Sequence, residues 1–476
     1  MKFGFNNGPH LQDKDSTSKI MMRLSIALLP IILFSIYKNG ILPYIEGYTD
    51  LFGALKPLFI ILLAVLTSVL TEIIYFRFIL KKKDNVKGEI KKSFAIFPGL
   101  FLALTLPINT PLWLVIIGAF VATFIGKLIF GGLGYNIFNP ALVGSLFVVA
   151  AYGALIGSKG GYFNPMELDA VAGATPLSNL SNLNYLGTPS NLVDSFGGMS
   201  NFLLGFIPGS LGETSKLLII LGFIFLVITK VIKWIIPTTY VSVVFIMTLI
   251  IGLMNDMGIW YPAFHVLSGG LLFGAVFMAT DPVTSPTTKG GQALFGLGLG
   301  LLTVLFRFLT PYPEGVLTSI LTMNMLVFIL DRLGAKGKVA KKNVFIPIII
   351  MLILILGLSI YVGGNIKPSA SPVDDRFKIV NVEEKDNATI YKVTQKGFKG
   401  LIEATITIEN DKITSVDITS QHESYWSEIE NNNYLDTLIK NQSKIDEVDA
   451  IGGATISSNA LKSMISNVLK DYEVLK

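Results

Sequence analysis

Long apolar runs separated by short polar segments occupy the first three quarters of the chain. A helix needs about 20 apolar residues to cross a bilayer, and by that criterion about eleven runs are candidate spans, some of them short or broken. They lie near residues 20–37, 56–80, 94–106, 111–130, 138–154, 216–236, 238–254, 264–280, 293–310, 315–332 and 344–362. The pattern predicts a polytopic α-helical membrane protein embedded in a lipid bilayer.

In the last quarter, apolar residues alternate with polar ones or recur every three or four positions, which predicts a small soluble α/β domain. Apolar and polar residues alternate from Ile402 to Glu409, as in a half-buried strand, and residues 413–419 predict a second strand after a turn. Between Leu461 and Tyr472 the apolar residues recur every three or four positions, which predicts a helix. Ser457 or Ser458 is expected to cap this helix.

Four parts follow from these patterns. A membrane domain is predicted in residues 1–335, an additional transmembrane helix in 344–362, a linker in 363–376 and the small domain in 377–476. The linker is predicted because Gly, Ser and Pro accumulate there.

Composition supports a membrane protein and excludes several kinds of site. Mean hydropathy is +0.60 and only 15% of residues are charged, as in membrane proteins. The chain has no cysteine, so it has no disulfide and no Cys-ligated iron–sulfur cluster of its own. Its three histidines are scattered, so no metal site is expected. The net charge of +5 requires no nucleic-acid partner.

Basic residues predict the orientation in the membrane. They concentrate before the first apolar run, in residues 81–92, after the sixth and eighth runs, and in residues 332–342. All of these segments fall on one side of the bilayer if the N-terminus is cytoplasmic, as the positive-inside rule requires. The loop 155–215 and the tail 363–476 are then extracytoplasmic. The polar N-terminus does not resemble a cleaved signal peptide.

A short motif, Gly-Ala-Thr, occurs once in that loop and once in that tail. Each copy follows an aspartate, and together they comprise Asp169, Gly173, Ala174 and Thr175, and Asp449, Gly453, Ala454 and Thr455. A threonine between such small side chains is expected to be open to a modifying enzyme and able to carry a phosphoester-linked cofactor. The alternative is a pair of Gly/Ala-rich turns. The repeated spacing favours cofactor attachment over this alternative.

The two threonines differ in their predicted surroundings. Thr455 is expected just before a helix N-terminus, where free N–H groups and the helix dipole favour a phosphate. No helix start is evident after Thr175, where Pro176 is expected only to restrict the turn.

Acidic residues in the apolar runs are candidates for an ion pathway, because they are costly inside a membrane. Asp281 is the strongest, since it ends a Gly-rich run at an Asp-Pro pair, and a similar run ends at Asn139-Pro140. The alternative is that these glycines only allow close helix packing. Glu72 is a second candidate, or a structural ion pair with Arg77. Asp331 is a third, or a marker of the cytoplasmic interface.

Several of these motifs resemble a known family. Residues 95–335 resemble the D subunit of the Rnf complex and the B subunit of the sodium-translocating NADH:quinone oxidoreductase. The stretches that carry the resemblance are Gly131–Pro140, Gly212–Ser215, Ser268–Pro282, and Pro313–Gly315 with Met323-Asn324. Residues 344–476 resemble the G-subunit type, one span followed by an FMN-binding domain, with matches at Gly397, Gly400, His422 and Glu423. The resemblance implies about ten family helices, one extra span and an extracytoplasmic FMN-binding domain.

The resemblance also implies the cofactors and partners. In the family, the last threonine of Ser/Thr-Gly-Ala-Thr carries FMN through its phosphate, which implies covalent FMN on Thr175 and Thr455 and leaves riboflavin open as a further cofactor. This chain has Ala172 and Gly452 where the family has the hydroxyl residue. A flavin transferase is implied for maturation. Other Rnf-type or Nqr-type membrane and iron–sulfur subunits are the implied partners.

The function expected from the resemblance is that of a subunit in an ion-translocating oxidoreductase. Electrons pass through covalent FMN, coupled to translocation of Na⁺ or H⁺, and no complete activity or catalytic residue is expected in this chain alone. One alternative is an extracytoplasmic flavin relay to external acceptors without ion pumping. Another is a transporter with a separate binding module, which the two Gly-Ala-Thr sites disfavour.

Overall fold

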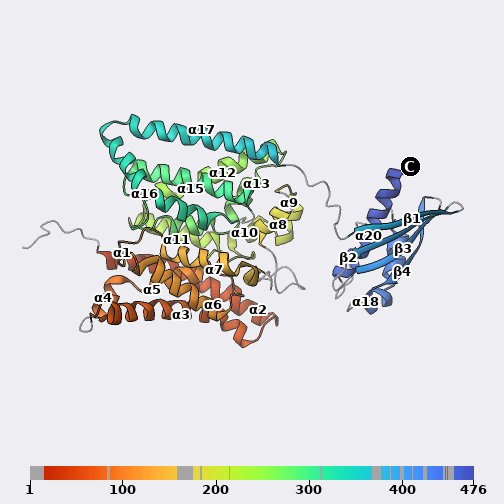
Figure 1. The fold of residues 1–476 in the computed structure, drawn as a ribbon, viewed down its shortest axis with the longest axis horizontal. Coiled ribbons are helices and arrows are strands. Elements are labelled where there is room, and N and C mark those ends of the chain that lie inside the picture. Colours follow the sequence, from red (N-terminus) through yellow and green to blue (C-terminus); the bar gives the residue numbers. More distant parts are fainter. Residues whose placement is uncertain are drawn as a thin grey trace, which may run out of the picture. The chain divides into compact units, whose positions relative to one another are not determined.

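The fold consists of two units of different kind. The computed structural model describes residues 16–82, 86–157, 175–182, 185–213, 215–310, 314–366, 377–385, 388–396, 401–409, 411–421, 426–442, 445, 448 and 455–475. The chain divides into the compact units Met1–Lys367 and Pro368–Lys476. The first is helical, and the second contains a four-stranded sheet (Figure 1).

Each apolar run of the first unit contains a helix. Six helical segments in the described ranges are long and apolar enough to cross a membrane: α1–η1–α2 (Thr17–Ile45), α3–η2 (Leu51–Ile79), α12 (Ile235–Met254), α15 (Lys289–Leu309), most of α16 (Val316–Val339) and α17 (Lys342–Asn365). Shorter apolar helices are α5 (Ile96–Thr105), α6–η4 (Leu112–Leu128), α7 (Pro140–Gly157) and α11 (Lys216–Ile228). The protein is therefore a multi-pass membrane protein.

The run predicted over residues 264–280 is not one continuous helix. It forms α13 (Trp260–Leu267) and α14–η6 (Leu271–Met278), which are bent by 62° at the intervening break. Ser268 is extended and Gly269 has a φ of 61°, a left-handed conformation that glycine adopts without strain. The break places free backbone groups inside the first unit, where they require partners.

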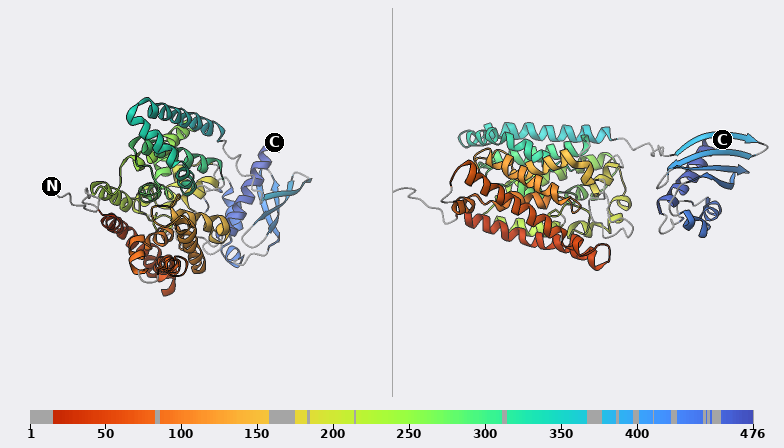
Figure 2. Two further views of the ribbon diagram at one scale, coloured as in Figure 1. Left: turned by 60° about the vertical axis from the view of Figure 1, so that its left-hand side comes forward. Right: turned by 60° about the horizontal axis from the view of Figure 1, so that its bottom comes forward.

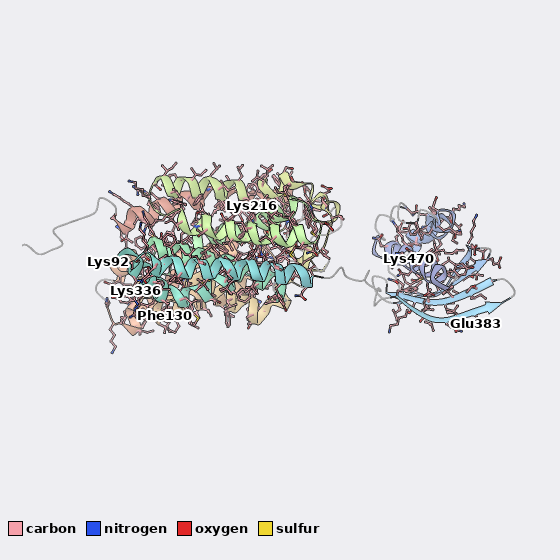
Figure 3. The ribbon with its side chains drawn as sticks, turned by 90° about the horizontal axis from the view of Figure 1, so that it is seen from above. Lys92, Phe130, Lys216, Lys336, Glu383 and Lys470 are labelled. Atoms are coloured by element: carbon pink, nitrogen blue, oxygen red, sulfur yellow. The ribbon has the colours of Figure 1, made fainter. Side chains whose placement is uncertain are left out.

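Short helices complete the first unit. They are α4 (Val86–Ser93), α8 (Pro176–Asn182), α9 (Pro189–Leu192), the 3₁₀ turn η5 (Asp194–Phe196) and α10 (Met199–Leu204). α8 and α10 add Leu177, Leu180 and Phe202 to the apolar core of this unit. In Figure 3, Lys92 and Lys336 lie at the same end of the helical bundle.

Glycines set how closely two of the long helices approach. A β-carbon at Gly300 of α15 would lie 2.5 Å from the Val243 side chain of α12, closer than any real contact. Inside a bilayer the hydrophobic effect does not drive helices together, so they associate through such close packing. The backbones of α15 and α12 therefore approach closely at Gly300.

The second unit is an antiparallel sheet covered by helices. Strands β1 (Phe377–Lys385), β2 (Ala388–Lys396), β3 (Leu401–Glu409) and β4 (Lys412–Ser420) pair in the order β1-β2-β3-β4. Figure 2 shows the sheet beside α20 (Thr455–Leu475), with α18 (Trp426–Asn431) and α19 (Tyr434–Lys440) in the same unit.

The sequence patterns of the tail are reproduced, with one correction. Alternate residues of β3 are buried, and the predicted apolar face of α20 packs on them through Leu461, Met464, Ile465 and Val468. The helix begins at Thr455, however, so Ser457 and Ser458 lie inside its first turns. Both serines are buried, and the expectation that one of them caps the helix is wrong.

Candidate functional site

Thr175 lies directly before a helix, which the sequence did not indicate. Its hydroxyl oxygen accepts the backbone N–H of Ser178 at 3.2 Å and lies 2.9 Å from the Ser178 hydroxyl. This is the geometry of an N-cap at the start of α8. The side chain is only 6% exposed, so the expectation of an open threonine is wrong here. In this conformation both contacts of the hydroxyl are with Ser178.

Thr455 is the first residue of α20, a helix of 21 residues. The first N–H groups of such a helix have no intrahelical partner, and with the helix dipole they favour an anionic group such as a phosphate. Eight further predicted site residues lie outside the described ranges: Asp169, Gly173, Ala174, His422, Glu423, Asp449, Gly453 and Ala454.

The break between α13 and α14 is held by charged side chains. The Lys216 ammonium donates to the carbonyl oxygen of Gly269 at 2.6 Å and also to that of Glu213. The Glu314 carboxylate accepts the N–H of Gly270 at 3.2 Å. The cation thus contacts a carbonyl just after the C-terminal end of α13, and the carboxylate accepts the N–H of the residue that precedes α14, as the two helix dipoles favour.

Two further buried cations are Arg307, which contacts the end of α13, and Lys38, which contacts a residue of the segment before Glu213. The Arg307 guanidinium donates to the carbonyl of His265 at 2.6 Å and to that of Glu314 at 3.4 Å. Its Nη2 atom is buried without a hydrogen-bond partner among the described residues. Lys38 is fully buried and donates to the carbonyl of Ile207. An unused cationic donor at this place fits a cofactor that bears a phosphate.

Glu72 pairs with a partner that its local sequence does not reveal. Its carboxylate lies 2.6 Å from the Lys127 ammonium, and the two side chains are 0% and 2% exposed. Lys127 also donates to the carbonyl of Ser93 at 2.6 Å. The alternative that Glu72 pairs with Arg77 is therefore wrong in its partner, because the guanidinium of Arg77 lies over the Phe78 ring instead.

Asp281 lies beside a cavity that the two Gly-rich runs share. Its carboxylate accepts the N–H and the hydroxyl of Thr284, at 3.2 and 2.9 Å. Asn139, from the other run, donates to the carbonyl of Met278 at 3.3 Å. The cavity, of about 80 Å³, has Lys127, Asn136, Asn139 and Asp281 among its lining residues. The two helix breaks that the sequence suggested as a pair thus meet in space.

Asp331 is engaged in a backbone turn. Its two carboxylate oxygens accept the N–H and hydroxyl groups of both Thr287 and Thr288, at 2.8 to 3.0 Å. Thr288 in turn caps α15. Because the carboxylate is occupied by four donor groups, these contacts favour its structural interpretation over a place in an ion pathway.

Comparison with known proteins gives two family matches in one chain. Residues 5–340 match the NQR2, RnfD, RnfE family. Residues 397–470 match the FMN-binding domain. Thr175 lies within the first match and Thr455 within the second.

Known relatives are similar to this chain over most of their length. The chain is 36% identical over 334 residues to the D subunit of the proton-translocating ferredoxin:NAD(+) oxidoreductase complex of Clostridium ljungdahlii, covering 69% of this chain and 94% of the relative. It is 36% identical over 327 residues to the D subunit of the Na(+)-translocating ferredoxin:NAD(+) oxidoreductase complex of Acetobacterium woodii, covering 69% and 92%. The B subunit of the Na(+)-translocating NADH-quinone reductase of Azotobacter vinelandii is 36% identical over 263 residues, covering 54% and 63%.

Proposed function

Because the chain belongs to the NQR2, RnfD, RnfE family and carries a C-terminal FMN-binding domain, we propose that it relays electrons through two covalently bound FMN groups. Family membership makes it a multi-pass membrane subunit of an electron-transport complex. The finer proposal is a Rnf-type or Nqr-type complex in which this electron transfer drives Na⁺ or H⁺ across the membrane.

The observation that carries the proposal is the position of the two threonines. One Gly-Ala-Thr copy lies in each matched region, so each region has its own candidate attachment point. In each, a flavin transferase is proposed to join the FMN phosphate to the hydroxyl oxygen of Thr175 or Thr455. The phosphoanhydride bond of a flavin dinucleotide breaks as the ester forms, and the nucleoside monophosphate leaves with the hydroxyl proton. FMN exchanges one or two electrons when bound, and the protein positions it.

The chain requires partners for this relay. It contains no cysteine, so iron–sulfur clusters must belong to other subunits of the complex. A flavin that exchanges single electrons connects such clusters to two-electron donors and acceptors.

The sidedness of the chain is part of the proposal. The positive-inside rule supports a cytoplasmic N-terminus and a small domain outside the cell membrane. Covalent attachment then prevents loss of the external flavins by diffusion. Protease added to cells stripped of their wall is expected to cut the tail and to spare residues 81–92, and protection of the tail contradicts this orientation.

Ion movement decides between the proposal and its alternative. The assembly is purified from native membranes, its subunits are identified, and it is reconstituted into sealed vesicles. Electron transfer is expected to build a Na⁺ or H⁺ gradient across the vesicle membrane. Electron transfer to external acceptors with no gradient in tight vesicles supports the non-pumping relay instead.

Asp281→Asn tests the ion pathway in the same vesicles. The substitution keeps the shape and the acceptor for Thr284 but removes the charge at the shared cavity. If Asp281 binds the moving cation, turnover should lose most of its dependence on Na⁺ or on pH, while flavin content stays unchanged. Asp331→Asn is the matched control, because its carboxylate serves the α15 turn. An unchanged ion response in assembled Asp281→Asn excludes the role.

A further inference from the structure

Buried cations outnumber buried carboxylates at the helix break near Thr175. Lys38, Lys216 and Arg307, named here the basic cluster, are at most 1% exposed. They come from three different elements, η1 (Tyr37–Ile41), α11 and α15. Lys38 and Lys216 are electrostatic neighbours of each other, and Lys216 is a neighbour of Arg307. The sequence distributes these residues over about 270 positions, so only the fold brings them together.

Two carboxylates face the basic cluster. Glu213 is an electrostatic neighbour of all three cations, and Glu314 is a neighbour of Lys216 and Arg307. A β-carbon added to Gly270 would lie 2.4 Å from Glu213 Oε2, and one added to Gly269 would lie 2.3 Å from Glu314 Oε2. Both carboxylates therefore lie against the helix break.

The hydrogen bonds of the basic cluster go to backbone carbonyls. Lys38 donates to Ile207, Lys216 to Glu213 and Gly269, and Arg307 to His265 and Glu314. Within the described ranges, none of the three has a carboxylate oxygen within 4.0 Å. With every group ionised, three positive charges face two negative ones. The site therefore lacks one negative charge, and burying a charge without compensation is costly.

The site lies close to Thr175. Leu177, two residues after it, packs against Gly269, where a β-carbon would lie 2.8 Å from the leucine Cδ1 atom. The carbonyl of the same glycine accepts the Lys216 ammonium. Two residues of extended chain span at most about 7 Å. Thr175 is therefore two residues from a side chain that packs on the same glycine that Lys216 contacts.

We propose that the basic cluster supplies the counter-charge for the phosphodiester of an FMN carried on Thr175. A phosphodiester carries one negative charge, which balances the count. Arginine suits this role, because its fork of donors matches phosphate oxygens, and Arg307 Nη2 is the donor without a partner. The inference rests on the proposed function, since it requires a flavin at Thr175.

The test measures how much the flavin stabilises the protein when the cluster loses a charge. All proteins carry Thr455→Ala, so that Thr175 holds the only covalent flavin. The melting temperature is compared between protein made with and without the flavin transferase, in detergent. Flavin attachment is expected to raise the melting temperature of the protein with an unsubstituted basic cluster, and to raise it less in the Lys38→Met variant. Lys38→Arg is expected to restore the full increase.

Two further variants test whether the effect is confined to the basic cluster and whether it follows the sign of the charge removed. Lys56→Met removes a half-buried lysine of α3 that lies outside the basic cluster, and should leave the increase unchanged. Glu213→Gln removes a negative charge, and should make the increase larger. The reduction potential of the Thr175 flavin provides a second measurement in every variant that folds. It should become more negative in Lys38→Met and more positive in Glu213→Gln.

The outcomes separate this inference from the proposed function. Mass spectrometry first establishes whether the unsubstituted chain carries FMN on Thr175. No flavin there contradicts both the proposed function and the counter-charge. Flavin present, with the same melting increase and the same potential in Lys38→Met, Glu213→Gln and the unsubstituted protein, contradicts the counter-charge alone.

Discussion

Replacing Thr175 and Thr455 together by alanine is expected to remove all covalent flavin from the protein. Each single substitution should remove about half, because each threonine hydroxyl carries one phosphoester under the proposed function. Alanine lacks the oxygen that forms this bond. The measurement is flavin fluorescence of the denatured chain in a gel, after co-expression with a flavin transferase, normalised to the amount of protein.

Two controls separate the chemistry from folding. Thr175→Ser keeps the hydroxyl and the cap on Ser178, so it should retain more flavin than Thr175→Ala. Thr175→Ala also loses the cap of α8, at a cost of about 1 kcal/mol, and its membrane insertion and yield are therefore measured in parallel. A full flavin signal in the double variant would falsify attachment at these two residues.

Breaking the buried ion pair between Glu72 and Lys127 is expected to have the largest effect on stability. Lys127→Met leaves the Glu72 carboxylate buried without its cation, and Glu72→Gln leaves the opposite charge alone. Removing one partner of a buried pair typically costs about 3–5 kcal/mol. Lower yield and a lower melting temperature in detergent are the expected results.

The double variant and a surface pair complete this experiment. Glu72→Gln combined with Lys127→Met removes both charges and should recover much of the lost stability, because apolar replacement of a whole buried pair is often neutral. Glu89→Gln breaks the exposed pair with Lys82 and should leave the melting temperature nearly unchanged. Single variants that keep normal stability but lose the ion response would indicate that the pair serves transport instead.

Much of the fold could be predicted from local patterns. Apolar length alone placed a helix in each predicted run, because the bilayer imposes that length on any spanning helix. Pro107 and Pro111 marked the gap between α5 and α6, since proline removes a backbone donor. In the tail, the alternation in β3 and the apolar face of α20 were both readable from a few neighbouring residues. These features depend on interactions that are near in the chain.

The candidate site could be predicted only in part. The repeated Gly-Ala-Thr motif singled out Thr175 and Thr455. It did not show that Thr175 caps α8 and is buried. Glu72 was identified as a buried acid, yet its partner was not, because Lys127 lies 55 positions away. Nothing in the local sequence of Lys38 or Lys216 predicted a place in the site, since each is only an isolated charge in a segment with few charges.

The sequence by itself determined the membrane class and the separate C-terminal domain, and it predicted the chemistry of the two threonines. Each of these depends on composition, periodicity or a short motif, which local residues define completely. Only the tertiary structure decided which charges share a site: Glu72 with Lys127, the two Gly-rich runs around one cavity, and the basic cluster at the α13–α14 break. Electrostatic energy depends on distance in space and on burial, and neither is contained in sequence spacing.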